Sequence, residues 1–299
     1  AEALLFLAGR QPIFGGPGAK VTAQAAKHMV DLYFGLLERK AVTPAELRRF
    51  IVQTVWTLFA EDVGILESRP LETLVRALLA DTTRSTAVEL ADLYRRFDIQ
   101  DSERRNRGRS NSVPYVNGEL FATVVEVHLN KSELEDLLEA SRFDWKFVNP
   151  TVFGSLLEGC LGHDHRWELG AHYTNEQDIM LIVEPVIIRP WVKRIESTKN
   201  FKEATRLHTE LCKFKVIDPA MGCGNFLSVA YRELRILELR LHDRISQHAI
   251  EDGHQEPLDM QYYPINNIQG IEIEPFAVDI AKTTLWMTHA LESRRHGIA

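Results

Sequence analysis

Two short segments of this chain combine carboxylates, small residues and helix starts in an order that could hold a nucleoside. The first segment reads Val216-Ile217-Asp218-Pro219-Ala220-Met221-Gly222-Cys223-Gly224-Asn225-Phe226-Leu227, in which a β-rich stretch ends in Asp218, a turn of small residues follows and a helix begins. Gly222 and Gly224 have no Cβ, so the turn can adopt positive φ angles and approach a ligand closely. Asp218 can accept a hydrogen bond from a ligand ammonium group. A tight turn that needs glycine only for steric reasons remains an alternative explanation of Gly-x-Gly by itself.

The second segment, Gln269-Gly270-Ile271-Glu272-Ile273-Glu274-Pro275-Phe276, again reads as a strand, an acidic residue and a helix start. A carboxylate at the end of a neighbouring strand is well placed to receive both hydroxyls of a ribose. Glu272 lies 54 residues after Asp218, however, whereas a compact dinucleotide fold has about 20. Leu227 also occupies the third glycine position, and no Gly-Lys-Ser/Thr follows, so NAD, FAD and a P-loop are disfavoured. Acids that favour a helix N-terminus are the alternative interpretation of Glu272 and Glu274.

The elements that must position these segments follow from hydrophobic periodicity and helix-capping residues. In the first half, helices are predicted over Ala23–Glu38, after the cap Thr43-Pro44, over Leu71–Ala80 and Ser85–Phe97, and after a capping box of Ser132 with Glu135. In the second half, the prediction is a helix over Asn175–Ile188, a strand over Lys215–Ile217, a helix over Asn225–Ile245, a strand over Ile268–Ile273 and a helix over Pro275–Leu291. Strands that alternate with helices predict a parallel sheet, hence an α/β domain over 145–299 behind a helical region over 1–144.

Composition and charge exclude several function classes. The 299 residues are 45% hydrophobic and 26% charged, with a formal net charge of −7, so the chain as a whole is no cationic surface for nucleic acid or anionic lipid. Three cysteines without a Cys-x-x-Cys pair favour a reducing compartment, and the expected location is the cytoplasm. No apolar run approaches membrane-spanning length, so no membrane partner is expected.

Together with Gly170-Ala171-His172-Tyr173-Thr174, the two segments resemble the S-adenosyl-L-methionine-binding half of amino-group DNA methyltransferases whose cofactor motifs precede the catalytic one. Among these enzymes, the segments resemble those of the MmeI-like restriction and modification enzymes, with the methyltransferase of the DISARM phage-defence system as a relative. Leu58–Ile65 and Pro114–Phe121 also resemble the helical region that these enzymes place before the methyltransferase domain. The resemblance spans most of the chain. It implies part of a Rossmann-like S-adenosylmethionine-dependent methyltransferase core behind an all-helical domain.

The resemblance also implies cofactor contacts, position by position. The methionine end would border the segment 171–174, the amino-acid and adenosine portions would lie around the glycine turn, Glu272 would hold the ribose, and Ile273 would pack against the adenine. The complete expected set is Ala171, His172, Tyr173, Thr174, Asp218, Pro219, Ala220, Gly222, Gly224, Asn225, Phe226, Glu272 and Ile273. Two positions depart from the family's pattern, since Met221 replaces the usual cysteine and Cys223 a usual serine. Both fit a turn lined by backbone, so binding is expected to survive with altered packing.

The family's catalytic motif, Asn-Pro-Pro followed by an aromatic residue, does not occur in this sequence. Methyl transfer to an exocyclic amine needs a group that accepts the amine's hydrogen bonds, and the aromatic residue stacks on the flipped base. Asn149-Pro150-Thr151 lies before the cofactor motifs and is interpreted as a turn that caps a helix. By the family's order, the catalytic motif and the target-recognition domain are expected beyond residue 299. No catalytic residue is therefore assigned within the chain, which is expected to be inactive alone.

Two further groups of residues carry weaker signals. Cys160, His163, Asp164, His165 and His172 do not match zinc-site spacing, and no metal ligand is assigned. The arginines of the Arg104–Arg109 stretch form either a phosphate-contacting arm or a solvated loop, the latter being favoured.

The resulting hypothesis is a site-specific DNA adenine-N6 methyltransferase of a restriction-modification or phage-defence system. Double-stranded DNA would be contacted mainly by segments outside this chain, with other defence-system subunits as partners. The alternatives are a non-catalytic S-adenosylmethionine-binding subunit and a methyltransferase that acts on RNA or protein glutamine.

Overall fold

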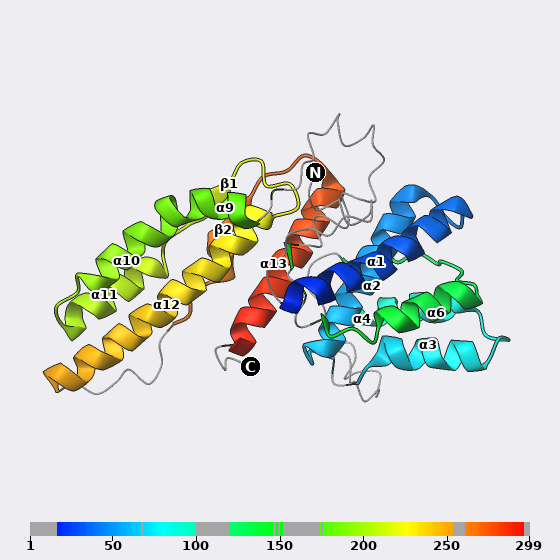
Figure 1. The fold of residues 1–299 in the computed structure, drawn as a ribbon, viewed down its shortest axis with the longest axis horizontal. Coiled ribbons are helices and arrows are strands. Elements are labelled where there is room, and N and C mark those ends of the chain that lie inside the picture. Colours follow the sequence, from blue (N-terminus) through cyan, green and yellow to red (C-terminus); the bar gives the residue numbers. More distant parts are fainter. Residues whose placement is uncertain are drawn as a thin grey trace. The chain divides into compact units, whose positions relative to one another are not determined.

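The computed structural model describes residues 17–66, 68–99, 120–145, 148, 150–151, 174, 176–253 and 261–295, and their side chains from residue 27 onward. The chain divides into two compact units, Ala1–Tyr173 and Thr174–Ala299, coloured blue to green and green to red in Figure 1. The sequence places the boundary at 144/145. Most residues between the two positions lie outside the described part, so that boundary stays a prediction.

The described part of the N-terminal unit is helical, as its periodicity predicts. Its helices are α1 (Pro17–Glu38), α2 (Pro44–Asp62), α3 (Pro70–Ala80), α4 (Thr86–Phe97) and α6 (Lys131–Ala140). The predicted cap of α2 is confirmed as a capping box, because the Thr43 hydroxyl accepts from Glu46 N at 3.3 Å and the Glu46 carboxylate accepts from Thr43 N at 2.9 Å. These bonds satisfy backbone donors that the first turn of a helix leaves unpaired.

Aromatic side chains fill the core of this unit. Trp56 of α2 packs edge-on against Phe97 of α4 and against Phe121, with ring centroids 5.5 and 5.2 Å apart. Phe97 and Phe121 are themselves 4.8 Å apart, and all three side chains are fully buried. Tyr94 is buried beside them, and its hydroxyl satisfies its hydrogen bond 2.7 Å from Thr54 Oγ1. Burial of rings in tilted and edge-on pairs therefore holds α2 against α4.

The helix after residue 130 is present, but its predicted capping box is wrong. Asn130, not Ser132, caps α6: its side chain accepts from Glu133 N at 3.0 Å, and the Glu133 carboxylate accepts from Asn130 N at 2.7 Å. Glu133 also pairs with Arg39 at 2.9 Å. Both Asn-x-x-Glu and Ser-x-x-Glu fit the capping pattern. The ion pair with Arg39, the residue that follows α1, favours the helix start that brings Glu133 into the interior.

The C-terminal unit combines helices with a small parallel sheet. In order along the chain, its elements are α9 (Glu176–Val183), the π-helix η3 (Glu184–Ile188), α10 (Arg189–Glu196), α11 (Phe201–Leu211), β1 (Val216–Asp218), α12 (Asn225–Asp252), the 3₁₀ turn η4 (Ile265–Asn267), β2 (Ile268–Gly270) and α13 (Pro275–Arg295). Strand, helix, strand and helix thus follow in the predicted order. The first strand is shifted by one residue, the second is shorter than predicted, and both long helices extend further than predicted.

The helical path through Pro185 and Pro190 also differs from the prediction, which ended the helix at Ile188. The chain continues as α10, with a π-helical turn in between, where Arg189 N donates to Glu184 O over five residues. A proline inside a helix lacks the N–H that would bond to the preceding turn. The wider π turn accommodates this loss and lets the helix continue. α10 and α11 were not predicted from the sequence.

The two strands pair in parallel with Val216, Ile217 and Asp218 opposite Ile268, Gln269 and Gly270. Helix α12 connects them, which makes a βαβ unit whose strand ends point the same way. The predicted adjacency of the two segments is therefore confirmed. Side chains from α9 to α13 and β2 form one core around α12, with Tyr231, Leu234 and Leu241 fully buried.

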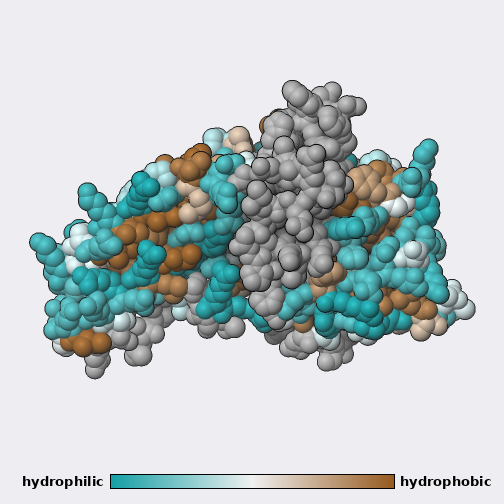
Figure 2. Space-filling view, in the orientation of Figure 1, coloured by the Kyte–Doolittle hydropathy of each residue, from teal (hydrophilic) through white to brown (hydrophobic). Residues whose placement is uncertain are grey.

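Several apolar side chains of this unit remain exposed. The exposed fractions are 74% for Leu181, 53% for Ile182 and 64% for Val186, along α9 and η3. Figure 2 shows such hydrophobic residues among the hydrophilic ones on the helices at the left of the view. No helix among the described residues is both long and apolar enough to cross a membrane.

A buried acid in α2 makes the stability of the N-terminal unit dependent on pH. Burial raises the pKa of Glu61 to about 7, although its carboxylate accepts from Leu71 N at 2.5 Å. Since the folded pKa exceeds the unfolded one, the folded chain holds a proton that the unfolded chain releases, and stability is lost as the pH rises from about 4.5 to about 7.

We expect this group alone to lower the free energy of unfolding by about 3 kcal/mol across that interval. Glu61→Gln should remove this part of the pH dependence, measured by urea unfolding at pH 5 and pH 8. The exposed Glu135→Gln is the control and should leave the dependence intact. Identical pH dependence in Glu61→Gln and the wild-type chain would contradict the expectation.

Candidate cofactor-binding site

The structure brings Asp218 and Glu272 to the same edge of the sheet. Asp218 closes β1 opposite Gly270, the last residue of β2, and Ile271 N donates to Asp218 O at 2.9 Å. Glu272 follows two residues after β2, so both carboxylates lie where the parallel strands end. This edge is where open α/β sheets bind their ligands.

Glu272 also holds the glycine turn and the start of α13 in place. Its Oε2 accepts from Gly222 N at 3.0 Å, and its Oε1 accepts from Ile273 N at 2.8 Å and from Glu274 N at 3.0 Å. A carboxylate has about four acceptor positions, so these backbone donors occupy most of them. Glu272 therefore does accept from backbone N–H groups just before α13, which is the helix N-terminal role that the sequence left as an alternative.

Asp218 fixes the other side of the same turn. Its Oδ1 accepts from Ala220 N at 3.0 Å, while Met221 N donates to Ile271 O at 3.1 Å across the two segments. The side chain of Asp218 is half-buried, and Pro219 and Ala220 are exposed. The turn thus presents its backbone and one carboxylate at the surface of the unit.

The two glycines of the turn serve different purposes. Both have positive φ, +52° at Gly222 and +79° at Gly224. A Cβ on Gly222 would meet no described atom within 4 Å, whereas one on Gly224 would lie 2.9 Å from the Cβ of Ala281 in α13. Gly222 leaves space above the turn, and Gly224 permits close packing of α12 against α13.

Met221, one of the two positions that depart from the pattern of the resembled enzymes, packs onto β2. A Cβ on Gly270 would lie only 2.1 Å from the Met221 sulfur. The long thioether therefore occupies space that any larger residue at position 270 would need. Met221 is partly buried and packs against the hydrophobic core. It does not fill the space above Gly222, where a Cβ would meet no described atom within 4 Å.

Asn225, at the start of α12, brings a polar group into this environment. Its side chain is 7% exposed, and its Oδ1 has no hydrogen-bond partner among the described residues. A buried acceptor without a partner costs free energy. Phe226 beside it is half-buried, whereas Ile273 is 87% exposed and does not form part of a closed wall.

The remaining predicted positions are only partly described. Ala171, His172 and Tyr173 lie outside the described residues; Thr174 is described and half-buried. Two residues later, Glu176 pairs with Arg232 at 2.7 Å, which ties the start of α9 to α12. The histidine-rich segment 160–172, the stretch 104–109 and Asn149 also lie outside the described residues.

A cluster of ligand-type side chains between α11 and α12 was not predicted from the sequence. His208, Cys212 and Glu238 are buried and present their ligand atoms within 4.8 Å of one another. His242 Nε2 lies 2.9 Å from His208 Nε2. The signal was available as two pairs with a spacing of four, His208 with Cys212 and Glu238 with His242, which places each pair on one helix face.

Both units match known proteins of one kind. Residues 194–296 match the family model of the DNA-methyltransferase domain of MmeI, and residues 45–121 match that of the MmeI helicase spacer domain. DNA methyltransferase A of Bacillus subtilis (strain 168) is 28% identical over 271 residues, which are 88% of this chain and 30% of that protein.

A solved structure of the type IIL restriction-modification enzyme MmeI in complex with DNA matches with a TM-score of 0.74 and 29% identity, covering 92% of this chain and 37% of that one. The chain therefore spans about a third of the length of these relatives. The matched range 194–296 contains β1, the glycine turn, β2 and all of α13.

The two glycines yield a direct comparison by mutation. We expect Gly222→Ala to lower the free energy of unfolding by about 1 kcal/mol, because only the left-handed backbone opposes the new Cβ. Gly224→Ala should lower it by about 1–3 kcal/mol more, because the same strain is joined by a clash with α13. Urea unfolding of both variants measures the difference. Equal losses would contradict the close packing at Gly224.

Proposed function

We propose, because this chain resembles the MmeI-like DNA methyltransferases in both units, that it is the helical and cofactor-binding portion of such an enzyme. In this proposal the βαβ unit is part of a Rossmann-like methyltransferase core that binds S-adenosylmethionine. The parent protein would methylate the N6 amino group of adenine at a specific DNA site, in the cytoplasm, for a restriction-modification or phage-defence system. Defence-system subunits would be its partners.

The observation that carries the proposal is the meeting of Asp218 and Glu272 at one sheet edge around an open glycine turn. Such a pair of acids suits a ligand with an ammonium group at one end and ribose hydroxyls at the other. The space above Gly222 admits a ligand next to the backbone, and the buried Asn225 Oδ1 offers a further acceptor. These features fit S-adenosylmethionine.

Each residue of the turn has a distinct proposed contact. Asp218, Ala220, Gly222 and Phe226 would surround the amino-acid and adenosine portions, with Pro219, Gly224 and Asn225 shaping the turn. Glu272 would hold the ribose, and Ile273 would pack against the adenine. The methionine end would border Ala171, His172, Tyr173 and Thr174.

In this proposal, Glu272 both holds the turn through backbone hydrogen bonds and binds the ribose. Its oxygens already accept from three backbone N–H groups, so ribose hydroxyls would share these oxygens with the turn. The backbone bonds fix the carboxylate in one orientation before a ligand arrives. A fixed acceptor loses little conformational freedom on binding, which favours affinity.

The bound cofactor would supply an electrophilic methyl group on its sulfonium, and this chain would position it. With a net charge of −7, the chain offers no general attraction for phosphates, so the proposal assigns most contacts with double-stranded DNA to other parts of the enzyme.

Isothermal titration with S-adenosylmethionine tests the site. Asp218→Asn keeps an oxygen that can accept from Ala220 N but removes the negative charge, so we expect the turn to stay folded. The affinity for the cofactor should fall at least about tenfold, which corresponds to about 1.4 kcal/mol for the loss of one charge-assisted contact. Glu272→Gln should also weaken binding and, in addition, lower stability. Asp243→Asn, on the exposed face of α12, is the control. Unchanged affinity in both site variants would refute the site.

The acceptor is tested in the full-length enzyme in its host. Mass spectrometry of genomic DNA should find N6-methyladenine at one discrete sequence, and the Asp218→Asn host should lose it because transfer requires the bound cofactor. Methylated RNA or protein glutamine in place of methylated DNA would overturn the assigned acceptor. Absence of methylation on DNA, RNA and protein glutamine, together with intact cofactor binding, would indicate a binding subunit without catalysis.

A further inference from the structure

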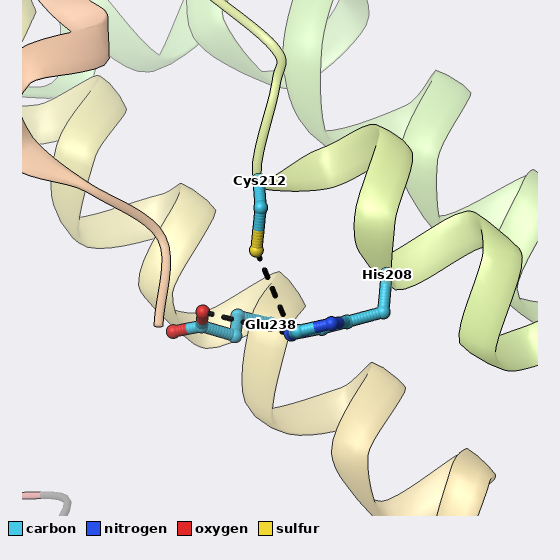
Figure 3. Close-up of side chains that lie close together, drawn as sticks. All are labelled: His208, Cys212 and Glu238. Carbon is cyan, nitrogen blue, oxygen red and sulfur yellow. Dashed lines mark hydrogen bonds and ion pairs between the residues drawn. The ribbon is translucent and has the colours of Figure 1, made fainter. Parts of the chain in front are cut away.

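The cluster of His208, Cys212, Glu238 and His242 lies apart from the candidate cofactor site. His208 and Cys212 stand one turn apart at the end of α11, and Glu238 and His242 stand one turn apart on α12. Cys212 precedes β1 by four residues, whereas the glycine turn follows β1. The cluster thus joins the two helices at the entry to the strand, and Figure 3 shows three of its side chains converging.

The distances within the cluster are close to those of a metal site. His208 Nε2 lies 3.7 Å from Cys212 Sγ, 2.9 Å from His242 Nε2 and 3.9 Å from Glu238 Oε1. In tetrahedral zinc, with metal–sulfur bonds of about 2.3 Å and metal–nitrogen bonds of about 2.0–2.1 Å, neighbouring ligand atoms are about 3.3–3.6 Å apart. The ligand atoms of His208, Cys212 and Glu238 all lie within 4.8 Å of one another, so the side chains would have to draw together by up to about 1.2 Å to reach these separations.

We propose that these four side chains bind a divalent cation of the zinc type, which clamps α11 to α12. One thiolate, two imidazoles and one carboxylate form a donor set that suits zinc and disfavours magnesium or calcium, both of which prefer oxygen alone. The thiolate and the carboxylate supply two negative charges toward the ion, and the carboxylate shares its charge with the Arg235 guanidinium, 2.9 Å from its other oxygen. Three of the four side chains are buried, as in structural sites that exclude water.

The surroundings hold the ligands in orientation. Glu238 accepts from Tyr263 N through the oxygen that faces His208, and its other oxygen lies 2.9 Å from Arg235 Nε. Asn267 Nδ2 donates to Cys212 O at 2.8 Å. Partners that orient the ligands in this way are a regular feature of protein metal sites.

Burial disfavours the charged forms of the same groups when no ion is bound. It raises the pKa of Cys212 to about 11 and that of Glu238 to about 7, and it lowers the pKa of His208. Binding of the cation would therefore release the proton of the Cys212 thiol to solvent as the metal–sulfur bond forms. Without metal, Cys212 donates to Gln261 O at 3.5 Å.

The alternative is a hydrogen-bond network without metal, in which one histidine donates to the other. The two arrangements predict different spectra and different metal contents. Cobalt(II) is the probe because thiolate ligation produces a charge-transfer band in the near ultraviolet and tetrahedral geometry intensifies its visible bands.

The first experiment uses the chain with Cys160→Ser and Cys223→Ser, in which Cys212 is the only thiol. Titration with cobalt(II) should produce the thiolate band, saturate at about one ion per chain and be reversed by zinc. Cys212→Ser in the otherwise wild-type chain should abolish the band. His242→Gln should weaken cobalt binding at least tenfold, whereas His248→Gln, on the same helix, should not.

The second experiment needs no variant. Elemental analysis of the purified wild-type chain should find about one zinc per molecule, and a strong chelator should remove it and lower the thermal midpoint of the C-terminal unit. Absence of zinc, no cobalt band and no effect of the chelator would overturn the proposal in favour of the hydrogen-bond network. Because cofactor titration does not report on this cluster, either proposal can fail without the other.

Discussion

The hydrogen bond from Gly222 N to Glu272 Oε2, 3.0 Å long, connects the two segments on which the C-terminal unit depends. It joins the turn after β1 to Glu272, two residues after β2, so the register of the strands, the shape of the turn and the start of α13 are fixed together. Without it, the turn would keep only the bond from Ala220 N to Asp218 and the bond from Met221 N to Ile271 O. The position of both acids relative to one another follows from this bond and from the strand pairing.

Helix packing reinforces the same arrangement. Gly224 lies against Ala281, so α12 and α13 approach closely where they leave the two strands. Thr284 and Thr288 continue this contact along α13 as buried small residues. Small side chains allow two helices to approach without cavities, and the sheet edge therefore rests on a rigid pair of helices.

A buried glutamate on a central helix recurs in both units. Glu61 of α2 accepts from Leu71 N, and Glu238 of α12 accepts from Tyr263 N. In each case the acid binds a backbone donor in a segment that follows its own helix, and burial raises the pKa to about 7. Each acid satisfies a buried donor and makes the stability of its unit sensitive to pH near neutrality.

The sequence by itself determined the order of strands and helices, the capping of α2, and the two acids with the glycine turn between them, because these depend on local periodicity and on residue types at short spacing. Tertiary structure decided the rest. The register of α6 followed an ion pair between residues 94 positions apart in the chain, and the second duty of Glu272 required a bond across 50 residues. The cluster of His208, Cys212, Glu238 and His242 became visible only when α11 packed on α12, because each pair alone is an ordinary helical spacing and convergence of ligands is a property of the packed helices.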